Sequence, residues 1–294
     1  YNFGFTRLSL GIQDFDEAVQ KCINRKQSYE QVNQLTQQAR AIGYESVNYD
    51  LIYGLPLQTR DTVKKTIEKV LELKPDRIAF YSYAHVPWLK PGQRRYTEKD
   101  LPNAALKRSL YECGRNMFEK AGYEETGMDH FALPNDALSI AKYNKKLYRN
   151  FMGYTTFAGE LLIGLGVSSI SDTGGAFAQN EKTVEDYYAR IQSYEIPVTK
   201  GHILTKEDII LRKHIMSIMC HEETNWNNPD TQCSTINEAL PDLLEMEADG
   251  LINLKQQGIK VTDTGKPFLR NICMAFDARL QHKKQTNQLF SKSI

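Results

Sequence analysis

The chain begins with an alternation of apolar and polar positions that returns twice before residue 90. It predicts strands over residues 5–12, 45–56 and 77–85. Such alternation is typical of strands that bury one face, because successive side chains point to opposite sides. In the second strand Asn48 and Asp50 point away from the apolar residues. Strands that lie between helices normally have two apolar faces, so this polar face predicts contact with water or a ligand.

Helical spacing separates these strands. We predict helices over residues 27–42, from Thr59 to just before Pro75, and over residues 103–121, followed by strands over residues 123–132 and 161–171. Alternating strands and helices indicate an α/β fold with a parallel sheet. Such sheets carry their chemistry at the carboxyl ends of the strands, where Asp50 lies.

The pattern changes near residue 200. We predict helices over 205–220 and 234–249, a hairpin of strands 250–254 and 259–262, and a last helix over 264–280. This order is winged-helix-like, so we expect a barrel portion over residues 1–200 and a mainly helical cap domain over 201–294. The predicted strands are too few to close an eight-stranded barrel, and we therefore expect part of the fold upstream of Tyr1.

Charge balance and cysteine content limit which classes of function the sequence supports. The chain has 37 basic and 36 acidic residues, which provides no general field for nucleic acid or an anionic membrane. The longest apolar run, residues 161–170, is half the length of a membrane span, and no signal peptide opens the chain, so we expect a cytoplasmic protein. Five dispersed cysteines without a C-x-x-C pair indicate reduced thiols rather than disulfides or a cysteine metal site.

The polar strand faces supply the first candidate chemistry. The predicted interior offers Gln13, Asn48, Asp50 and Ser82, with Arg25 on a loop above them. A carboxylate beside amides and a guanidinium can hold a ligand that has hydroxyl and carboxylate groups. The alternative is that Asp50 and Arg25 form a structural ion pair at the rim of the sheet.

Two histidines, His85 and His130, end predicted strands, where a single histidine is more often a satisfied polar residue than a catalyst. His130 is the better candidate, because Asp129 adjoins it and Arg149 follows in a segment that can reach the same edge. His130 and Arg149 are therefore our candidate substrate-binding residues.

Five motifs together carry a resemblance to a known family. They are Gly-Ile-Gln-Asp-Phe at 11–15, the strand and turn at 47–56, Gly-Met-Asp-His-Phe-Ala at 127–132, Arg-Asn-Phe-Met-Gly-Tyr-Thr-Thr at 149–156 and Arg-Asn-Ile-Cys-Met at 270–274. In this order they resemble the oxygen-independent coproporphyrinogen III oxidases, which are radical S-adenosylmethionine (SAM) enzymes, and the resemblance covers the whole chain. The first two motifs are shared with radical SAM haem chaperones, which are the alternative; a non-enzymatic winged-helix binding module is a third.

The resemblance implies the later part of a TIM-like partial β/α barrel, followed by a winged-helix-like cap. It also implies a reaction in which a 4Fe-4S cluster cleaves SAM and a 5′-deoxyadenosyl radical removes a hydrogen from each of two propionates of coproporphyrinogen III. Loss of carbon dioxide and an electron then gives the vinyl groups of protoporphyrinogen IX. An electron donor and an acceptor are implied but not identified. We expect a monomer that binds neither nucleic acid nor membrane.

The resemblance also assigns residues by motif position. Those that correspond to SAM-binding residues are Gln13, Arg25, Asp50 and Ala84, and those near a second SAM are Phe151 and Ile170. Met152 stands where a glutamine is common in the family, so this chain departs from the pattern there. The N-terminal C-x-x-x-C-x-x-C cluster motif is absent. We therefore expect the cluster ligands upstream, no metal ligand in this chain, and no activity of the 294 residues alone.

Overall fold

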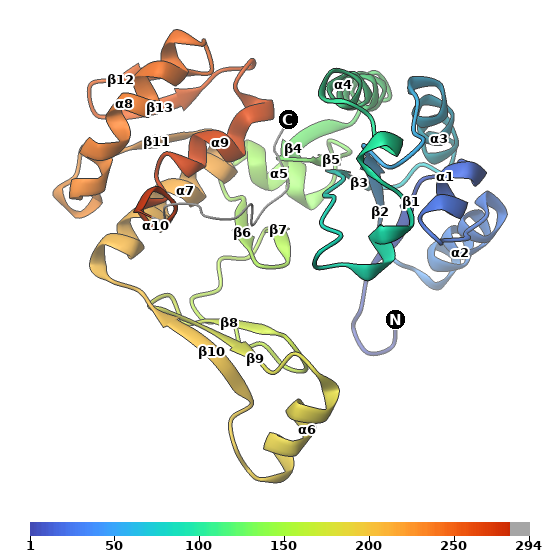
Figure 1. Cartoon of the computed structure of the whole chain (residues 1–294), viewed down its shortest axis with the longest axis horizontal. Coiled ribbons are helices and arrows are strands. Elements are labelled where there is room, and N and C mark those ends of the chain that lie inside the picture. The colour runs from blue at the N-terminus through green and yellow to red at the C-terminus, as the bar shows by residue number, and fades with distance from the viewer. Residues whose placement is uncertain (283–294) are drawn as a thin grey trace. The chain divides into compact units, whose positions relative to one another are not determined.

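A computed structural model describes residues 1–282 of the chain, which divide into two compact units, residues 1–140 and 141–282 (Figure 1). Each unit has its own sheets and is described by itself. The domain boundary predicted at residue 200 falls inside a strand, β10 (Val198–Ile203). The division into a barrel portion and a cap domain stays a prediction.

The first unit is built on a five-stranded sheet in the order β1-β2-β3-β5-β4. Its strands are β1 (Arg7–Gln13), β2 (Ser46–Tyr53), β3 (Arg77–Ser82), β4 (Glu124–Gly127) and β5 (His130–Ala132). The first three are parallel to one another, as predicted. They form the part of the sheet on which the candidate site lies.

The prediction of one strand over residues 123–132 is wrong. The chain reverses at Met128 and Asp129, and β4 and β5 pair antiparallel. Asp129 adopts a left-handed backbone conformation, φ 62°, which Asp tolerates better than most residues and which closes the turn. Because β5 also runs antiparallel to β3, the sheet is mixed rather than wholly parallel.

Helices connect these strands, and their ends follow local sequence signals. They are α1 (Glu17–Cys22), α2 (Tyr29–Ile42), α3 (Arg60–Glu72) and α4 (Ala104–Lys120), with short 3₁₀ turns at Pro91–Arg95 and Glu98–Asp100. A further helix, α5 (Ala137–Tyr143), follows β5 and continues past residue 140 into the second unit. Ser28 and Gln31 form a reciprocal capping box at the start of α2, and Gly43 ends it at φ 107°. Both α1 and α5 are too short to show a clear helical period and were not predicted.

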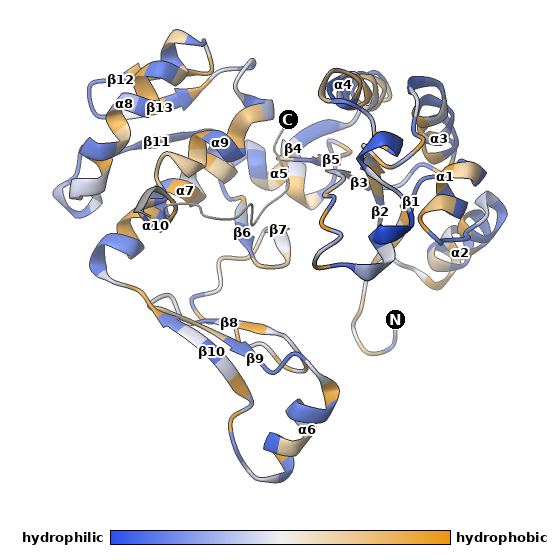
Figure 2. Cartoon of the chain, in the orientation of Figure 1, coloured by the Kyte–Doolittle hydropathy of each residue, from blue (hydrophilic) through white to orange (hydrophobic). Residues whose placement is uncertain are grey.

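One face of the sheet packs against helices. Phe80 of β3 is buried and meets Phe118 of α4 edge to face, with ring centroids 5.5 Å apart. Gly114 permits this approach, since a β-carbon there would collide with the Phe80 ring. Figure 2 shows that α3 and α4 carry both hydrophobic and hydrophilic residues, as amphipathic helices do. Burial of each such aromatic side chain contributes about 1.5–3 kcal/mol to the free energy of folding. The main role of this face is therefore to stabilise the fold.

The second unit begins with two small antiparallel sheets. A hairpin joins β6 (Tyr148–Asn150) to β7 (Gly153–Thr155), and a three-stranded sheet has the order β10-β9-β8, with β8 at Ile170–Asp172 and β9 at Ala176–Asn180. Helix α6 (Val184–Gln192) lies between β9 and β10. None of these elements except β8 was anticipated.

The prediction of a parallel strand over residues 161–171 is wrong. Only its end, from Ile170, is strand, and it pairs antiparallel with β9. Gly166 and Ser168 have φ values of 92° and 58°, and backbone in this left-handed region cannot continue a strand. The apolar composition of the segment was therefore misleading, because its glycines and serines form a loop.

The remainder of the second unit contains the two predicted helices and the predicted hairpin, together with a strand, β11 (Glu223–Asn225), that the sequence does not predict. It contains α7 (Lys206–His221), β11, α8 (Ser234–Ala248), β12 (Ile252–Lys255) and β13 (Gly258–Val261), and the sheet order is β11-β13-β12. Helix, strand, helix and hairpin in this order are winged-helix-like. A 3₁₀ turn, Pro229–Thr231, lies between β11 and α8.

The single last helix predicted over residues 264–280 is wrong. The segment divides into a 3₁₀ turn at Lys266–Phe268, α9 (Leu269–Met274) and α10 (Ala278–His282). The break after α9 inserts Phe276 into the core, where it is fully buried next to His214 and Trp226. Helical spacing alone did not reveal this break.

Candidate functional site

The strand register shows which side chains share the polar face. Asp50 of β2 lies opposite Gly11 of β1 and opposite Ala79 of β3, and Ala79 in turn lies opposite His130 of β5. Residues directly opposite each other on neighbouring strands project from the same side of a sheet. Asp50 and His130 therefore point to one face, which is not the face that packs against Phe118 and α4.

Asp50 is held by two neighbouring polar side chains. Ser9 Oγ donates a hydrogen bond to Asp50 Oδ2 at 3.1 Å, and Asn48 Nδ2 donates to Asp50 Oδ1 at 2.8 Å. Asn48 Nδ2 also lies 2.9 Å from Ser9 Oγ. The three side chains form a closed triangle, and each carboxylate oxygen of Asp50 keeps capacity for a further donor.

Gln13 and Arg25 lie over Gly11 on the same face. A β-carbon built on Gly11 would be 2.7 Å from Gln13 Nε2 and 3.3 Å from Arg25 Nη2. Arg25 donates a hydrogen bond to the Gly11 carbonyl oxygen, and Gln13 turns back over the strand with φ 66°. The absence of a side chain at Gly11 makes room for both groups, and the structure thus brings Gln13, Arg25 and Asp50 together.

The structural alternative, an ion pair between Asp50 and Arg25, is not observed. Asp50 accepts its hydrogen bonds from Ser9 and Asn48, whereas Arg25 donates to Gly11 and lies 3.5 Å from Gln27 Oε1. Among residues 1–282 no carboxylate pairs with the Arg25 guanidinium. A carboxylate and a guanidinium, each with unused hydrogen-bonding capacity, are suited to a ligand that carries both a donor and an acceptor.

Tyr81 and His130 extend the polar face. Tyr81 Oη lies 3.2 Å from His130 Nε2, and His130 Nδ1 lies 2.7 Å from the Met128 carbonyl oxygen. A carbonyl can only accept, so Nδ1 carries a proton; in a neutral ring Nε2 then accepts from Tyr81. The expectation that Ser82 faces the ligand is wrong, because Ser82 lies opposite the buried Tyr53.

Ala84 lies in the exposed loop after β3 and is held through its backbone. Gln93 Nε2 donates to the Ala84 carbonyl oxygen at 3.1 Å, and Lys107 Nζ donates to the carbonyl oxygen of Tyr83 at 3.0 Å. Burial lowers the pKa of Lys107. In the same loop His85 packs on Tyr96, with ring centroids 5.6 Å apart, rather than on the polar sheet face. The loop is thus fixed by side chains that do not belong to the predicted site.

In the second unit, Phe151 and Ile170 belong to one local arrangement. Phe151 meets Phe177 of β9 edge to face at 5.2 Å. Phe177 pairs with Asp172, two residues after Ile170, so Ile170 and Phe177 share a face of the small sheet. Met152 is almost fully exposed beside Phe151. The structure therefore brings the two predicted residues of a second site onto the same side of this sheet.

Arg149 is engaged within its own unit. Its guanidinium lies over the Tyr154 ring, 4.7 Å from the centroid, and Nη1 is buried without a hydrogen-bond partner among residues 1–282. Burial raises the pKa of Cys220 to about 11 and of Cys273 to about 12, and the Arg149 charge moderates both shifts. Arg149 therefore neighbours two thiols that stay protonated at neutral pH.

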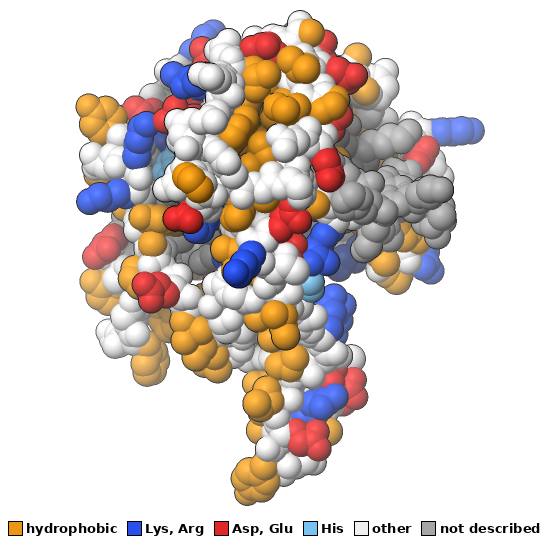
Figure 3. All heavy atoms as spheres, turned by 90° about the vertical axis from the view of Figure 1, so that its left-hand side faces the viewer, with side chains coloured by type: hydrophobic (Ala, Val, Ile, Leu, Met, Phe, Trp, Pro, Cys, Tyr) orange, Lys and Arg blue, Asp and Glu red, His pale blue; other side chains and the backbone are white. Residues whose placement is uncertain are grey.

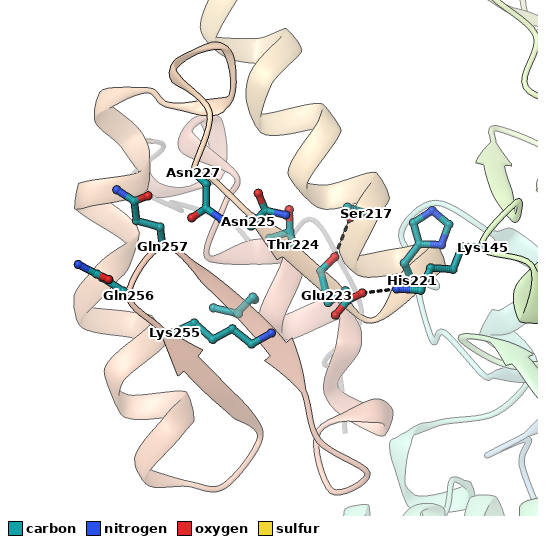
Figure 4. A pocket seen from close by; sticks show the side chains of 11 residues that line it. Lys145, Ser217, His221, Glu223, Thr224, Asn225, Asn227, Lys255, Gln256 and Gln257 are labelled. Carbon is teal, nitrogen blue, oxygen red and sulfur yellow. Dashed lines mark hydrogen bonds and ion pairs between the residues drawn. The ribbon is translucent and has the colours of Figure 1, made fainter.

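A polar depression of about 400 Å³ lies elsewhere in the second unit, between the end of α7, β11 and the β12–β13 turn (Figure 4). Lys145 pairs with Glu223 at 2.6 Å, and Ser217 Oγ donates to the Glu223 carbonyl oxygen at 2.6 Å. Burial and the Lys145 charge lower the pKa of His221. Lys145, Ser217 and Glu223 thus satisfy one another, and no residue of the predicted site lines this depression.

Within residues 1–282, no three histidine, cysteine or acidic side chains are grouped so that they could hold a metal ion. The location of the cluster ligands outside this chain stays a prediction. In the same part of the chain, no helix has the length and apolar character needed to cross a membrane.

The chain is similar in sequence and in structure to known proteins. Residues 2–70 match the Radical SAM superfamily. The chain is 40% identical to an oxygen-independent coproporphyrinogen III oxidase of Pseudomonas aeruginosa, and the match covers 99% of this chain and 64% of that protein. It is 41% identical to an oxygen-independent coproporphyrinogen III oxidase of Thermostichus vulcanus, with 99% of this chain and 91% of that protein covered. A solved structure of coproporphyrinogen III oxidase from Escherichia coli, described as a radical SAM enzyme, matches with a TM-score of 0.87 and 39% identity over 94% of this chain and 65% of that one.

The chain thus spans 64–65% of the length of the Pseudomonas and Escherichia proteins. The Thermostichus protein is matched over nearly its whole length, and the match includes the second unit as well as the first. These alignments together with the α/β fold show that the chain belongs to the family of oxygen-independent coproporphyrinogen III oxidases, within the radical SAM superfamily.

Proposed function

We propose that the natural full-length protein converts two propionates of coproporphyrinogen III to vinyl groups without oxygen and yields protoporphyrinogen IX. The observation that carries this proposal is the polar face of β1 and β2. There Gln13, Arg25 and Asp50 converge over Gly11, and the two charged groups do not neutralise each other. The family named above supplies the class of reaction, and this face supplies a place for its cofactor in the chain.

SAM suits these groups chemically. Arg25 can donate to the carboxylate of its methionyl part, and Asp50 can accept from its ammonium or from ribose hydroxyls. Gln13 can do either through its amide, and Ala84 offers backbone groups in a fixed loop. When SAM and a 4Fe-4S cluster are bound, they supply the radical that abstracts hydrogen. The residues of this chain bind SAM and restrict its orientation.

A second SAM molecule is part of the proposal. Phe151 and Phe177 offer an aromatic surface on the face that also carries Ile170, and aromatic rings bind flat or sulfonium-bearing ligands well. Met152 replaces a polar residue common in the family, and we expect it to make only apolar contact.

For the substrate, we assign His130 ahead of Arg149. His130 and Tyr81 point to the face that also carries Asp50, and the Tyr81 hydroxyl can donate to a propionate carboxylate once it gives up its bond to His130. Arg149 instead stacks on Tyr154. The reaction also requires an electron donor for the cluster and an acceptor for the last electron of each decarboxylation. We expect the protein to work as a cytoplasmic monomer.

The test compares two alanine variants of the full-length protein under anaerobic conditions. Asp50→Ala should weaken SAM binding about tenfold or more, because it removes a charge-assisted hydrogen bond worth about 1.5–3 kcal/mol. His85→Ala should leave SAM binding nearly unchanged, because His85 packs on Tyr96. Equal SAM dissociation constants for the two variants would refute the assignment. Tight haem binding without protoporphyrinogen formation would instead favour the haem chaperone.

A further inference from the structure

We propose that Ser9 and Asn48 are positioning residues, which fix the Asp50 carboxylate in the orientation that receives SAM. This inference rests on the proposed function of Asp50. The family resemblance assigns a SAM-binding role to neither Ser9 nor Asn48, although Asn48 lies within the motif at 47–56. What singles them out is the closed triangle of side-chain hydrogen bonds, with lengths of 2.8, 2.9 and 3.1 Å.

The protons of this triangle can be counted. The Asn48 amide has two N–H donors, one of which goes to Asp50 Oδ1 and the other to Ser9 Oγ. The Ser9 hydroxyl then uses its one proton to donate to Asp50 Oδ2. Every donor is used once, and each carboxylate oxygen receives one bond. The carboxylate cannot rotate about χ2 without breaking two hydrogen bonds.

The orientation of Asp50 decides what it can bind. With one bond to each oxygen already made within the sheet, the remaining lone pairs accept from groups above the polar face. Only a donor can be placed there, so the ligand group over Asp50 is an ammonium or a hydroxyl pair and not a carboxylate. A carboxylate of the same ligand would be directed to Arg25, which lies over the neighbouring Gly11.

The fold itself does not need the triangle. All three bonds join side chains, and none satisfies a backbone N–H or carbonyl group. The apolar side chains of β2 that stabilise the sheet, such as Tyr49 and Leu51, project from the opposite face and are fully buried. Ser9 is exposed, and water could satisfy its hydroxyl equally well. These three hydrogen bonds therefore contribute little to the stability of the fold, and stability alone does not explain them.

The experiment is a double-mutant cycle measured with SAM on the full-length protein. Asn48→Leu and Ser9→Ala are each made in the wild type and in Asp50→Ala, and SAM dissociation constants are measured by anaerobic calorimetry. In the wild type each change should weaken SAM about three- to tenfold, because Asp50 loses one of its two restraints. In Asp50→Ala the same changes should have less than about a twofold effect. Ser9→Thr keeps the hydroxyl on a side chain that is favoured in β-strands, and unlike Ser9→Ala it should bind SAM with wild-type affinity.

The possible failures are distinguishable. If Asp50→Ala weakens SAM but Asn48→Leu and Ser9→Ala do not, the positioning role is refuted and the proposed SAM site stands. If the effects of Asn48→Leu and Asp50→Ala add, Asn48 does not act through Asp50, and the inference is again refuted. If Asp50→Ala leaves SAM binding intact, the proposed site itself is refuted together with the inference.

Discussion

Gly11→Ala separates ligand binding from stability at the candidate site. Gly11 lies within β1 and does not have a positive φ, so an alanine can adopt its backbone conformation. The new β-carbon would be 2.7 Å from Gln13 Nε2, which is closer than such atoms are found, and 3.3 Å from Arg25 Nη2. The Gln13 amide must therefore move away, and the Arg25 guanidinium must shift by a few tenths of an ångström.

The magnitude follows from what each group loses. In the proposed site, a displaced Gln13 would lose one uncharged hydrogen bond to SAM, about 0.5–1.5 kcal/mol, so we expect SAM affinity to fall about three- to tenfold. Stability should not fall with it. Glycine within a strand costs roughly 0.5–1 kcal/mol relative to alanine, and the groups that move are the flexible ends of side chains. We expect the free energy of unfolding to stay the same or rise slightly.

The assay pairs SAM titration with urea unfolding of the same preparation. Gly92→Ala is the matched control, since Gly92 also lacks a positive φ and a β-carbon there would meet nothing within 4 Å. It should leave SAM affinity unchanged. The reasoning about the space over Gly11 is wrong if Gly11→Ala binds SAM like the wild type. It is equally wrong if Gly11→Ala loses more than about 1 kcal/mol of stability, because the new β-carbon would then be disturbing the sheet rather than the site.

Three further outcomes are expected. Burial lowers the pKa of His214, whose Nε2 donates to the Thr231 carbonyl. The folded state therefore resists protonation, and stability should be full above about pH 6.5 and decline as pH falls below it; urea midpoints should show a smaller decline for His214→Gln. The 294-residue chain should bind no 4Fe-4S cluster on anaerobic reconstitution, because its cysteines are dispersed, and a thiolate-to-iron absorption band that survives desalting would contradict this. Mixed-sequence duplex DNA at low salt should bind no more tightly than about 10⁻⁴–10⁻⁶ M, and tighter binding would restore the nucleic-acid alternative.

The DNA expectation rests on charge. From residue 201 onward the sequence has 11 basic and 12 acidic residues. In the position of a recognition helix, α8 carries four acidic side chains and no basic one: Glu238, Asp242, Glu245 and Glu247. Figure 3 shows basic side chains interspersed with acidic and hydrophobic ones on the face it presents. DNA-binding proteins instead concentrate positive charge where they meet phosphates.

Elements with strong local signals could be predicted from the sequence. The helices at Tyr29–Ile42 and Ala104–Lys120 differ from their predicted ranges by two residues or fewer, since each combines an apolar stripe with a capping residue, Ser28 or Asn103. Where the signal was only composition, as in residues 161–171, the prediction was wrong. Within that run Gly166 and Ser168 adopt left-handed backbone conformations, which turn the segment into a loop. Apolar composition does not reveal these conformations.

The candidate site could be predicted only in part, because alternation gives two faces but does not say which one meets the ligand. In β3 small residues occur on both faces, at Ala79 and at Ser82. The pattern of β3 alone favours Ser82, yet the register with β2 places Ala79 and Tyr81 on the Asp50 face. That register depends on contacts between strands distant in sequence, and it was not available from β3 alone.

The triangle of Ser9, Asn48 and Asp50 also depends on the register between strands that are distant in sequence. Ser9 and Asn48 are 39 positions apart in sequence and meet only because β1 and β2 pair them directly. A slip of one residue would turn Ser9 to the opposite face and leave Asp50 with Asn48 alone. The apolar residues of β1 fix that register by burial, since Leu10 and Ile12 must remain on the core side. Burial on one face of the sheet therefore determines the orientation of a carboxylate on the other. Alternation along β2 is enough to place Asn48 on the same face as Asp50, whereas the contribution of Ser9 depends on the pairing of β1 with β2.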